Sequence, residues 1–206
     1  MRRQFPLAFT QIESSDPPRY RGSVRALIIT DVQNDFCEGG SLEVSRGAEV
    51  ASGISELLAS DHGYAHVVAS KDFHINPGEH FSDHPDYAVS WPRHCVVGTS
   101  GAEFHPNLAT DAVEAVFHKG QYAAAYSSFE GADDDGTLLA DWLRQRGVDA
   151  VDIVGIATDY CVRATAAAAV AEGFETRVLV DLTAGVAPDS TAKAIEDLRS
   201  AGVEIS

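Results

Sequence analysis

Short apolar runs alternate with amphipathic segments along most of the chain. Five runs have the length and the apolar content that are typical of buried strands. They cover residues 25–30, 65–70, 112–119, 150–157 and 176–181, and a last short run, VEI, lies near the C-terminus. Segments with helical periodicity separate most of these runs, at residues 46–60, 138–147, 160–172 and 188–201. Gly147 and Gly173 follow two of these segments, as is common where a helix ends.

This alternation predicts the fold class. Strands that alternate with helices form βαβ units, which build a parallel sheet with helices on both faces. We therefore expect an α/β fold with three α-β-α layers and a mostly parallel, doubly wound sheet of about six strands. The 206 residues suffice for one domain with a full core. We expect that domain at residues 24–206, after a poorly ordered N-terminal extension (1–23) whose apolar FPLAF stretch is too short for a signal peptide.

The charge indicates which partners the protein can have, and the cysteine content indicates its cellular compartment. The chain has 15 Lys and Arg against 31 Asp and Glu, a net charge of −16. Such a surface repels phosphate backbones and anionic lipids, so neither nucleic acid nor a membrane is expected as a partner. Three cysteines are few and odd in number, which favours reduced thiols and a cytoplasmic location over a disulfide scaffold. Nothing in the sequence requires more than a monomer.

Polar residues follow several of the predicted strands. Ligands of open α/β sheets bind beyond the carboxyl ends of the strands, so these residues are the first candidates for a site. They are Asp31, Asp72, Lys119, Asp159, Cys161 and Asp181. About forty irregular residues, from Lys71 to about Thr110, interrupt the alternation, and so long an irregular stretch in a compact domain is usually functional.

Cys161 stands where the predicted strand 150–157 turns into a helix. The positive end of a helix dipole favours a thiolate, and free backbone N–H groups lie close by. Asp31 could take the proton of this thiol, and Lys119 could stabilise the negative charge that develops. Taken singly, Cys161 fits a buried structural cysteine better, and Asp31 and Lys119 fit a helix cap or a surface charge better. Together at one crevice they make a nucleophile, a base and a cation.

The irregular stretch contains a carboxylate and three imidazoles in the segments DFHINPGEH and WPRHC. These are Asp72, His74, His80 and His94. One carboxylate with several histidines suits one divalent metal ion, Zn²⁺, Fe²⁺ or Mn²⁺, with open positions for water or substrate. The alternative is a polar loop whose histidines only form hydrogen bonds. The other histidines fit no such pattern: His62, His66, His84, His105 and His118.

In these motifs the chain resembles the nicotinamidase/pyrazinamidase branch of the isochorismatase-like cysteine hydrolases. The resemblance runs from about Arg25 to the C-terminus. It rests on ALIITDVQNDFCEGGSL, KDFHINPGEHFS, SWPRHCV, the lysine of VFHKG, and GIATDYCVRATA. It implies a catalytic triad of Asp31, Lys119 and Cys161, and Asp72, His74, His80 and His94 as metal ligands. It also implies an oxyanion hole made by the backbone N–H groups of Ala157 and Cys161, with a cis peptide bond before Ala157.

The resemblance also implies a substrate. Phe36 and Trp91 correspond to the aromatic pocket of the family, and Tyr126 is expected to form part of its wall. Tyr160 stands where close relatives often have histidine, which is expected to alter the pocket but not the triad. The implied reaction is the hydrolysis of an aromatic carboxamide, nicotinamide, to nicotinate and ammonia in NAD salvage, with pyrazinamide as a further substrate. A thioester on Cys161 is the expected intermediate.

Three other interpretations remain open from the sequence. The first is an amidohydrolase on the same scaffold that acts on a carbamoyl or ureido compound, although those branches resemble this chain in the triad and not in the metal ligands. The second is a metallohydrolase in which a metal-activated water is the nucleophile and Cys161 is structural. The third is a binding protein with a degenerate site, which the presence of all three triad residue types disfavours.

Overall fold

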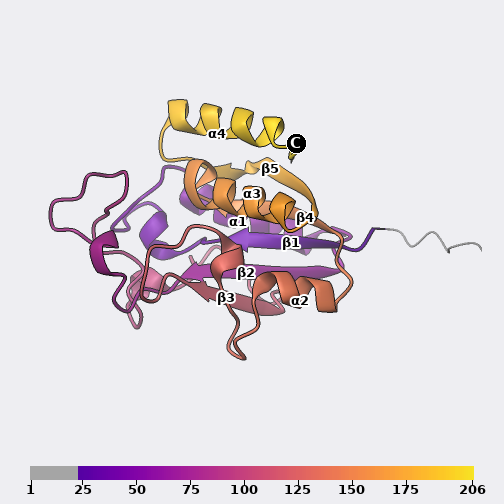
Figure 1. Cartoon of the computed structure of the whole chain (residues 1–206), viewed down its shortest axis with the longest axis horizontal. Helices are drawn as coiled ribbons and strands as arrows, with labels where there is room; N and C mark the ends of the chain where they lie inside the picture. The colour runs from indigo at the N-terminus through magenta and orange to yellow at the C-terminus, as the bar shows by residue number, and fades with distance from the viewer. Residues whose placement is uncertain (1–22) are drawn as a thin grey trace, which may run out of the picture.

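The computed structural model describes residues 23–206, so the predicted N-terminal extension lies, apart from Ser23, outside the described residues. Within 23–206 six strands form one sheet in the order β3-β2-β1-β4-β5-β6, and every neighbouring pair is parallel (Figure 1). This confirms the predicted parallel α/β sheet. The strands are β1 (Arg25–Thr30), β2 (His66–Asp72), β3 (Ala115–Lys119), β4 (Ala150–Ile156), β5 (Glu175–Ala184) and β6 (Glu204–Ile205).

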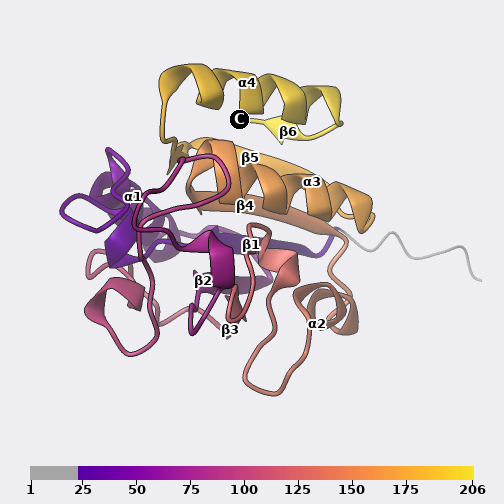
Figure 2. The same ribbon diagram turned by 60° about the vertical axis from the view of Figure 1, so that its left-hand side comes forward.

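In the part of the chain that the structure describes, four α-helices complete the three layers that the sequence predicts. Helix α1 lies on one face of the sheet, and α2 and α3 lie on the other (Figure 1). Helix α4 packs along α3 and leads into the edge strand β6 (Figure 2). The bounds are α1 (Gly47–Ala59), α2 (Leu139–Gln145), α3 (Arg163–Ala171) and α4 (Pro188–Ser200). Gly147 and Gly173 have φ of 69° and 87° after α2 and α3, the left-handed backbone that glycine adopts most easily at a helix end.

Several boundaries differ from the predicted ones. Strand β5 continues to Ala184, because its end pairs with the end of β4 beyond a register shift. Asp181 therefore lies exposed inside a strand, and the prediction that it stands at a strand end is wrong. Strand β3 begins three residues later than the predicted run, after a turn in which the Val113 N–H bonds the Thr110 carbonyl. One π turn, Thr158–Val162, precedes α3.

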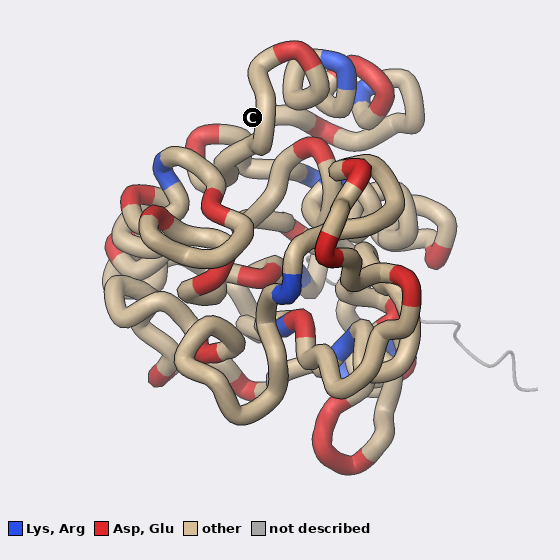
Figure 3. The backbone as a smooth tube through the Cα atoms, turned by 90° about the vertical axis from the view of Figure 1, so that its left-hand side faces the viewer, with Lys and Arg blue, Asp and Glu red and all other residues tan. Residues whose placement is uncertain are grey.

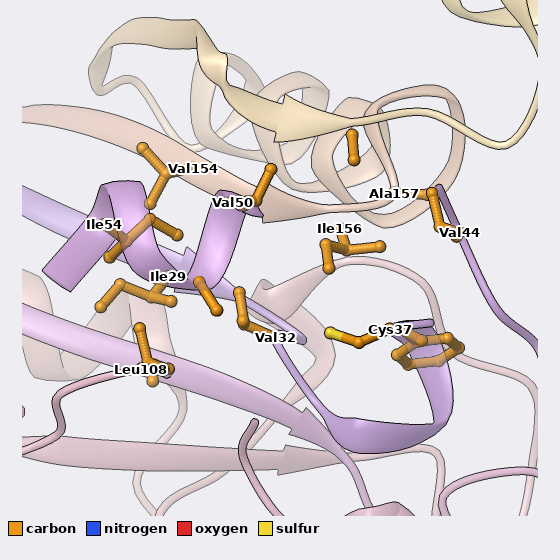
Figure 4. Close-up of a cluster of buried hydrophobic side chains, with 14 of the residues drawn as sticks. Ile29, Val32, Cys37, Val44, Val50, Ile54, Leu108, Val154, Ile156 and Ala157 are labelled. Atoms are coloured by element: carbon orange, nitrogen blue, oxygen red, sulfur yellow. The ribbon is translucent and has the colours of Figure 1, made fainter. Parts of the chain in front are cut away.

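The sheet separates two apolar cores. Adjacent residues of a strand point to opposite faces, so Ile28 and Ile29 of β1 belong to different cores. The core under α1 contains Ile29, Val50 and Ile54 together with the first loop residues after β1 (Figure 4). Strands buried on both faces explain why the sequence shows continuous apolar runs here instead of alternating ones.

The strand order reverses between β1 and β4, which makes this point the topological switch of the sheet. The loops that follow the strands, together with most of the irregular stretch 73–114, gather at the carboxyl ends of the strands. Figure 3 is a view onto this end, where acidic positions outnumber basic ones. A crevice at the switch point is the usual ligand site of such sheets, so the fold directs attention to the residues that stand there.

A buried carboxylate joins three strands within the sheet. Asp152 of β4 is fully buried, and its Oδ1 accepts hydrogen bonds from Arg25 of β1 at 2.6 Å and from Arg177 of β5 at 3.0 Å. The Tyr64 hydroxyl donates to Oδ2 at 2.6 Å. Both carboxylate oxygens therefore have partners. The loss of this group would leave the Tyr64 hydroxyl without this acceptor and each arginine with only an exposed glutamate, Glu175 or Glu204.

We expect Asp152→Ala to lower the free energy of unfolding by about 3 kcal/mol, the scale for breaking a buried charge pair. Glu49→Ala is the control, because it removes an exposed ion pair with Arg46 and should leave stability close to wild type. Urea denaturation of both variants measures the difference. Equal stabilities of the two variants would show that the Asp152 cluster does not hold the strands together.

Candidate active site

The structure brings the three predicted triad residues together. Asp31 follows β1, Lys119 ends β3, and Cys161 lies in the π turn between β4 and α3. The Lys119 Nζ is 2.9 Å from the Asp31 Oδ2 and 3.9 Å from the Cys161 Sγ. Strand β2 lies between β3 and β1, so the long lysine side chain reaches across the end of a strand to meet Asp31. All three side chains are buried.

Burial sets the protonation of the triad. It raises the pKa of the Cys161 thiol well above its usual value, against the opposing effect of Lys119. Burial also raises the pKa of Asp31, again against Lys119. For Lys119 itself, burial lowers the pKa, but Asp31 and Asp72 outweigh it, and the pKa is raised well above the usual value. The free site therefore holds a protonated thiol beside an ammonium, because burial outweighs the effect of Lys119 and of the helix start on the Cys161 thiol. The thiol needs a base.

Beside the triad, three histidines form a cluster with the geometry of a metal site. Ligand atoms of His74, His80 and His94 all lie within 4.8 Å of one another. The Asp72 Oδ2 is 3.5 Å from the His74 Nε2 and 3.8 Å from the His94 Nε2. The structure thus gathers the four predicted ligands, with His80 inside the cluster.

The donor atoms of this cluster fit a divalent cation. The Nδ1 atoms of His74 and His94 lie 2.6 and 2.7 Å from the carbonyls of Gly120 and Pro92, which leaves each Nε2 free as a ligand. The His74 Nε2 and the His80 Nδ1 are buried and have no hydrogen-bond partner among the described residues. Buried polar atoms are rarely left unpaired. A divalent metal ion would supply the missing partner.

Asp72 joins the triad to the histidine cluster. Its Oδ1 pairs with the Lys119 ammonium, while its Oδ2 faces the histidines. Burial alone raises the pKa of this carboxyl, but Lys119, His74 and His94 outweigh burial, so the pKa is lowered and the group is a carboxylate. One side chain therefore contacts both the cation of the triad and the candidate metal ligands.

The turn after β1 fixes the backbone of two candidate ligands. The Gln33 side chain accepts a hydrogen bond from the Asp72 N–H at 2.8 Å and donates one to the Asp72 carbonyl at 2.9 Å. The Asp35 carboxylate accepts one from the Cys95 N–H, next to His94, at 2.7 Å. Sequence reasoning missed both roles. The sequence feature that could have indicated these roles is the density of polar residues in DVQND, at the end of a buried strand.

An apolar cavity of about 260 Å³ opens beside Cys161. The predicted ring-binding residues Phe36, Trp91 and Tyr126 all line it. The Trp91 indole N–H donates to the Tyr126 hydroxyl at 3.1 Å, and the Trp91 and Tyr160 rings meet edge to face at 5.2 Å. Tyr160 thus belongs to the aromatic wall. Sequence reasoning did not identify seven further lining residues: Leu42, Glu43, Val44, Tyr87, Ala125, Ile156 and Val186.

The predicted oxyanion donors also lie at this cavity. Ala157 and Cys161 both line it, and the Ile156–Ala157 peptide bond is cis, as the resemblance implies. Asp159, a further strand-end candidate, has another role. Its Oδ1 accepts a hydrogen bond from the Val186 N–H at 2.9 Å, and its Oδ2 accepts from the Ser190 hydroxyl, so it fixes the entry to α4.

Comparison with known proteins establishes the family. The pattern of the isochorismatase domain matches residues 25–206, and the chain belongs to this family. It is 65% identical over 182 residues to the nicotinamidase/pyrazinamidase of Mycobacterium tuberculosis, covering 88% of this chain and 98% of that protein.

Solved structures agree with this assignment. The pyrazinamidase of Pyrococcus horikoshii in complex with zinc has a TM-score of 0.76 and 39% identity, over 89% of this chain and 98% of that one. The L. infantum protein in complex with nicotinate has a TM-score of 0.79 and 35% identity, over 89% and 92% of the two chains.

We expect His74→Ala and His94→Ala to lower the bound divalent metal toward zero, because each removes a buried donor of the cluster. His84→Ala is the control, since its imidazole is exposed on the same irregular stretch outside the cluster. Elemental analysis of the purified proteins measures the metal content. Stoichiometric metal in both His74→Ala and His94→Ala would show that these two histidines do not hold the metal ion.

Proposed function

We propose that this chain is an amidohydrolase that converts nicotinamide and water to nicotinate and ammonia, and that it also hydrolyses pyrazinamide. One observation carries the proposal: a buried thiol, Cys161, lies beside Asp31 and Lys119 on the wall of an aromatic cavity. The similarity to the nicotinamidase/pyrazinamidase of M. tuberculosis over nearly the whole of that protein supports the choice of substrate.

The first half of the reaction forms a thioester. Asp31 takes the proton of the Cys161 thiol, and the sulfur attacks the amide carbon. The negative charge on the carbonyl oxygen is stabilised by the backbone N–H groups of Ala157 and Cys161, and one such donor is typically worth about 10²–10³ in rate. The C–N bond then breaks, and the proton held by Asp31 passes to the leaving nitrogen, which departs as ammonia.

The second half releases the acid. A water molecule gives a proton to Asp31 and attacks the thioester carbon, and the C–S bond breaks. The proton returns to sulfur, which regenerates the thiol and frees the carboxylic acid. Lys119 keeps its charge throughout, because its raised pKa holds it as an ammonium. It thus stabilises negative charge on Asp31 or Cys161, whichever carries it.

Asp72, His74, His80 and His94 are the residues that would hold a divalent ion. When bound, the ion supplies a Lewis-acidic site for the ring nitrogen of the substrate. The zinc in the pyrazinamidase of P. horikoshii supports an ion of this class. Carboxylate and imidazole donors suit Zn²⁺, Fe²⁺ and Mn²⁺ alike.

The aromatic wall holds the ring of the substrate. Phe36 and Trp91 are buried in the cavity lining and present apolar surface to a planar ring. The hydrogen bond from Trp91 to Tyr126 fixes the orientation of the indole. The nicotinate bound to the L. infantum protein supports a pyridine carboxylate as the product.

The proposed product determines the proposed role of the enzyme in the cell. Nicotinate is a precursor for pyridine nucleotide synthesis, so we assign the reaction to NAD salvage. The cysteines at positions 37, 95 and 161 are all unpaired, which supports a reducing compartment such as the cytoplasm. Among residues 23–206 no helix has the length and apolar character needed to cross a bilayer. A monomer remains our expectation for the oligomeric state.

We expect Cys161→Ala to abolish ammonia release from nicotinamide while leaving the fold intact, because the thiol forms the bond to carbon. Cys37→Ala is the control, since this buried thiol lies in the core and burial raises its pKa to about 12. Steady-state ammonia release and circular dichroism are measured on both variants. Robust turnover by Cys161→Ala would favour the metallohydrolase interpretation.

Benzamide tests how the ring is recognised. It keeps the amide and the ring faces but lacks the ring nitrogen, so the polar contact to the metal site is lost. A site built around a polar contact strongly rejects an analogue without it, and we expect kcat/KM to fall by about 10³ or more. Pyrazinamide has an equivalent ring nitrogen and should be hydrolysed. Comparable turnover of benzamide and nicotinamide would refute recognition through the ring nitrogen, even with the triad intact.

A further inference from the structure

A chain of buried hydroxyl groups approaches Asp31 from the side opposite to its ion pair. The Asp31 Oδ2 pairs with Lys119, whereas its Oδ1 accepts a hydrogen bond from the Ser70 hydroxyl at 2.7 Å. The Ser128 hydroxyl donates to the Ser70 Oγ at 2.9 Å and lies 3.1 Å from the Thr165 Oγ1. Ser70, Ser128 and Thr165 are each fully buried.

Asp31, at one end of this chain of hydroxyl groups, determines which group donates in each hydrogen bond along it. A carboxylate can only accept, so the single proton of Ser70 points to Asp31. Ser128 then donates to Ser70, and the Ser128 oxygen can accept from Thr165. Thr165 is free to donate because its oxygen already accepts from the Ser128 N–H at 2.9 Å. All the hydroxyl protons thus point toward Asp31, and such an ordered buried chain polarises its members cooperatively.

The chain of hydroxyl groups connects Asp31, the proposed base, to the segment that contains Cys161, the proposed nucleophile. Ser70 is on β2, Ser128 is in a short 3₁₀ turn (Ser128–Glu130), and Thr165 is on α3, four residues after Cys161. These three hydroxyls therefore link Asp31 to the first part of the helix that follows the thiol, and the Thr30 hydroxyl, 3.4 Å from the Ser128 Oγ, adds a side branch. No step of the mechanism given above uses these three residues.

The Asp31 carboxylate has a separate partner for each of its oxygens, Lys119 at Oδ2 and Ser70 at Oδ1. The φ of Asp31 is +49°, a left-handed backbone that is uncommon for a residue other than glycine. In the reaction one carboxylate oxygen must receive and return a proton, while the carboxylate must not rotate away. A hydrogen bond held on Oδ1 keeps Oδ2 turned to Lys119, whose Nζ lies 3.9 Å from the Cys161 Sγ.

We propose that Ser70, Ser128 and Thr165 are positioning residues that orient the Asp31 carboxylate toward Cys161 during proton transfer. The inference rests on the proposed cysteine amidohydrolase function. Ser70 acts directly on Asp31, and Ser128 and Thr165 act through Ser70 by fixing the direction of its proton.

The first test is the split between kcat and KM for nicotinamide. A hydrogen bond to a charged group is lost in Ser70→Ala, which corresponds to a fall in kcat of about 10–100-fold with KM nearly unchanged. Ser70→Thr keeps the hydroxyl and should restore most of the activity. Thr176→Val is the matched control, because its buried hydroxyl bonds the Phe174 carbonyl far from the site, and it should keep wild-type kcat.

The double variant tests whether the residues act as one chain. Ser128→Ala should lower kcat by about tenfold, a share of that charged hydrogen bond. Ser70→Ala with Ser128→Ala should then be no slower than Ser70→Ala alone, since Ser128 acts through Ser70. Thr165→Val replaces Ser128→Ala if that variant does not fold. Additive losses, wild-type kcat in Ser70→Ala, or a loss explained by depleted metal would overturn the proposal.

Alkylation of Cys161 by iodoacetamide, followed by peptide mass spectrometry, distinguishes a failure of this inference from a failure of the proposed function. It reports thiol activation without any amide substrate. We expect slower alkylation in Ser70→Ala and recovery in Ser70→Thr, whether or not nicotinamide is hydrolysed. An unchanged alkylation rate in Ser70→Ala contradicts the positioning role, even if the wild-type protein releases ammonia from nicotinamide.

Discussion

The buried ammonium of Lys119 is the interaction on which the rest of the site depends. It contacts carboxylates on both sides, Asp31 and Asp72, and lies 3.9 Å from the Cys161 sulfur. An isolated ammonium is very costly to bury, so the two carboxylates must stay in place for the fold to accept it. The converse also holds, since two buried carboxylates without the lysine would repel each other. The proposed nucleophile, the proposed base and the carboxylate that faces the histidines are thus held by one charge at the ends of three strands.

This arrangement makes the triad and the histidine cluster a single unit. Asp72 contacts Lys119 with one oxygen and faces His74 and His94 with the other. Gln33, two residues after Asp31, holds the backbone of Asp72 through both its N–H and its carbonyl. A displacement of the turn after β1 would therefore disturb the base and the metal ligands together. The proposed catalytic base and the candidate metal ligands are coupled through ordinary hydrogen bonds.

The sequence predicted most of this because strand ends of a parallel sheet converge. Asp31, Lys119 and Cys161 each follow an apolar run, so their proximity could be expected from topology alone. Protonation could not be predicted: the position of Cys161 at a helix start favours thiolate, yet burial raises its pKa, and burial is a property of the packed molecule. The role of Ser70 was equally hidden, because a serine inside an apolar strand gives no sign of which partner it will meet.

The central claim is that the sulfur of Cys161 attacks the substrate carbon with Asp31 as the base. The most direct test uses nicotinaldehyde, which presents a carbonyl carbon to the thiol but has no amine to release. With the aldehyde carbon labelled, ¹³C NMR of the complex should show a tetrahedral carbon bonded to sulfur in the wild-type protein. That signal should be absent in Cys161→Ala. A bound aldehyde whose carbon stays trigonal, or is only hydrated, in the wild-type protein would contradict the account.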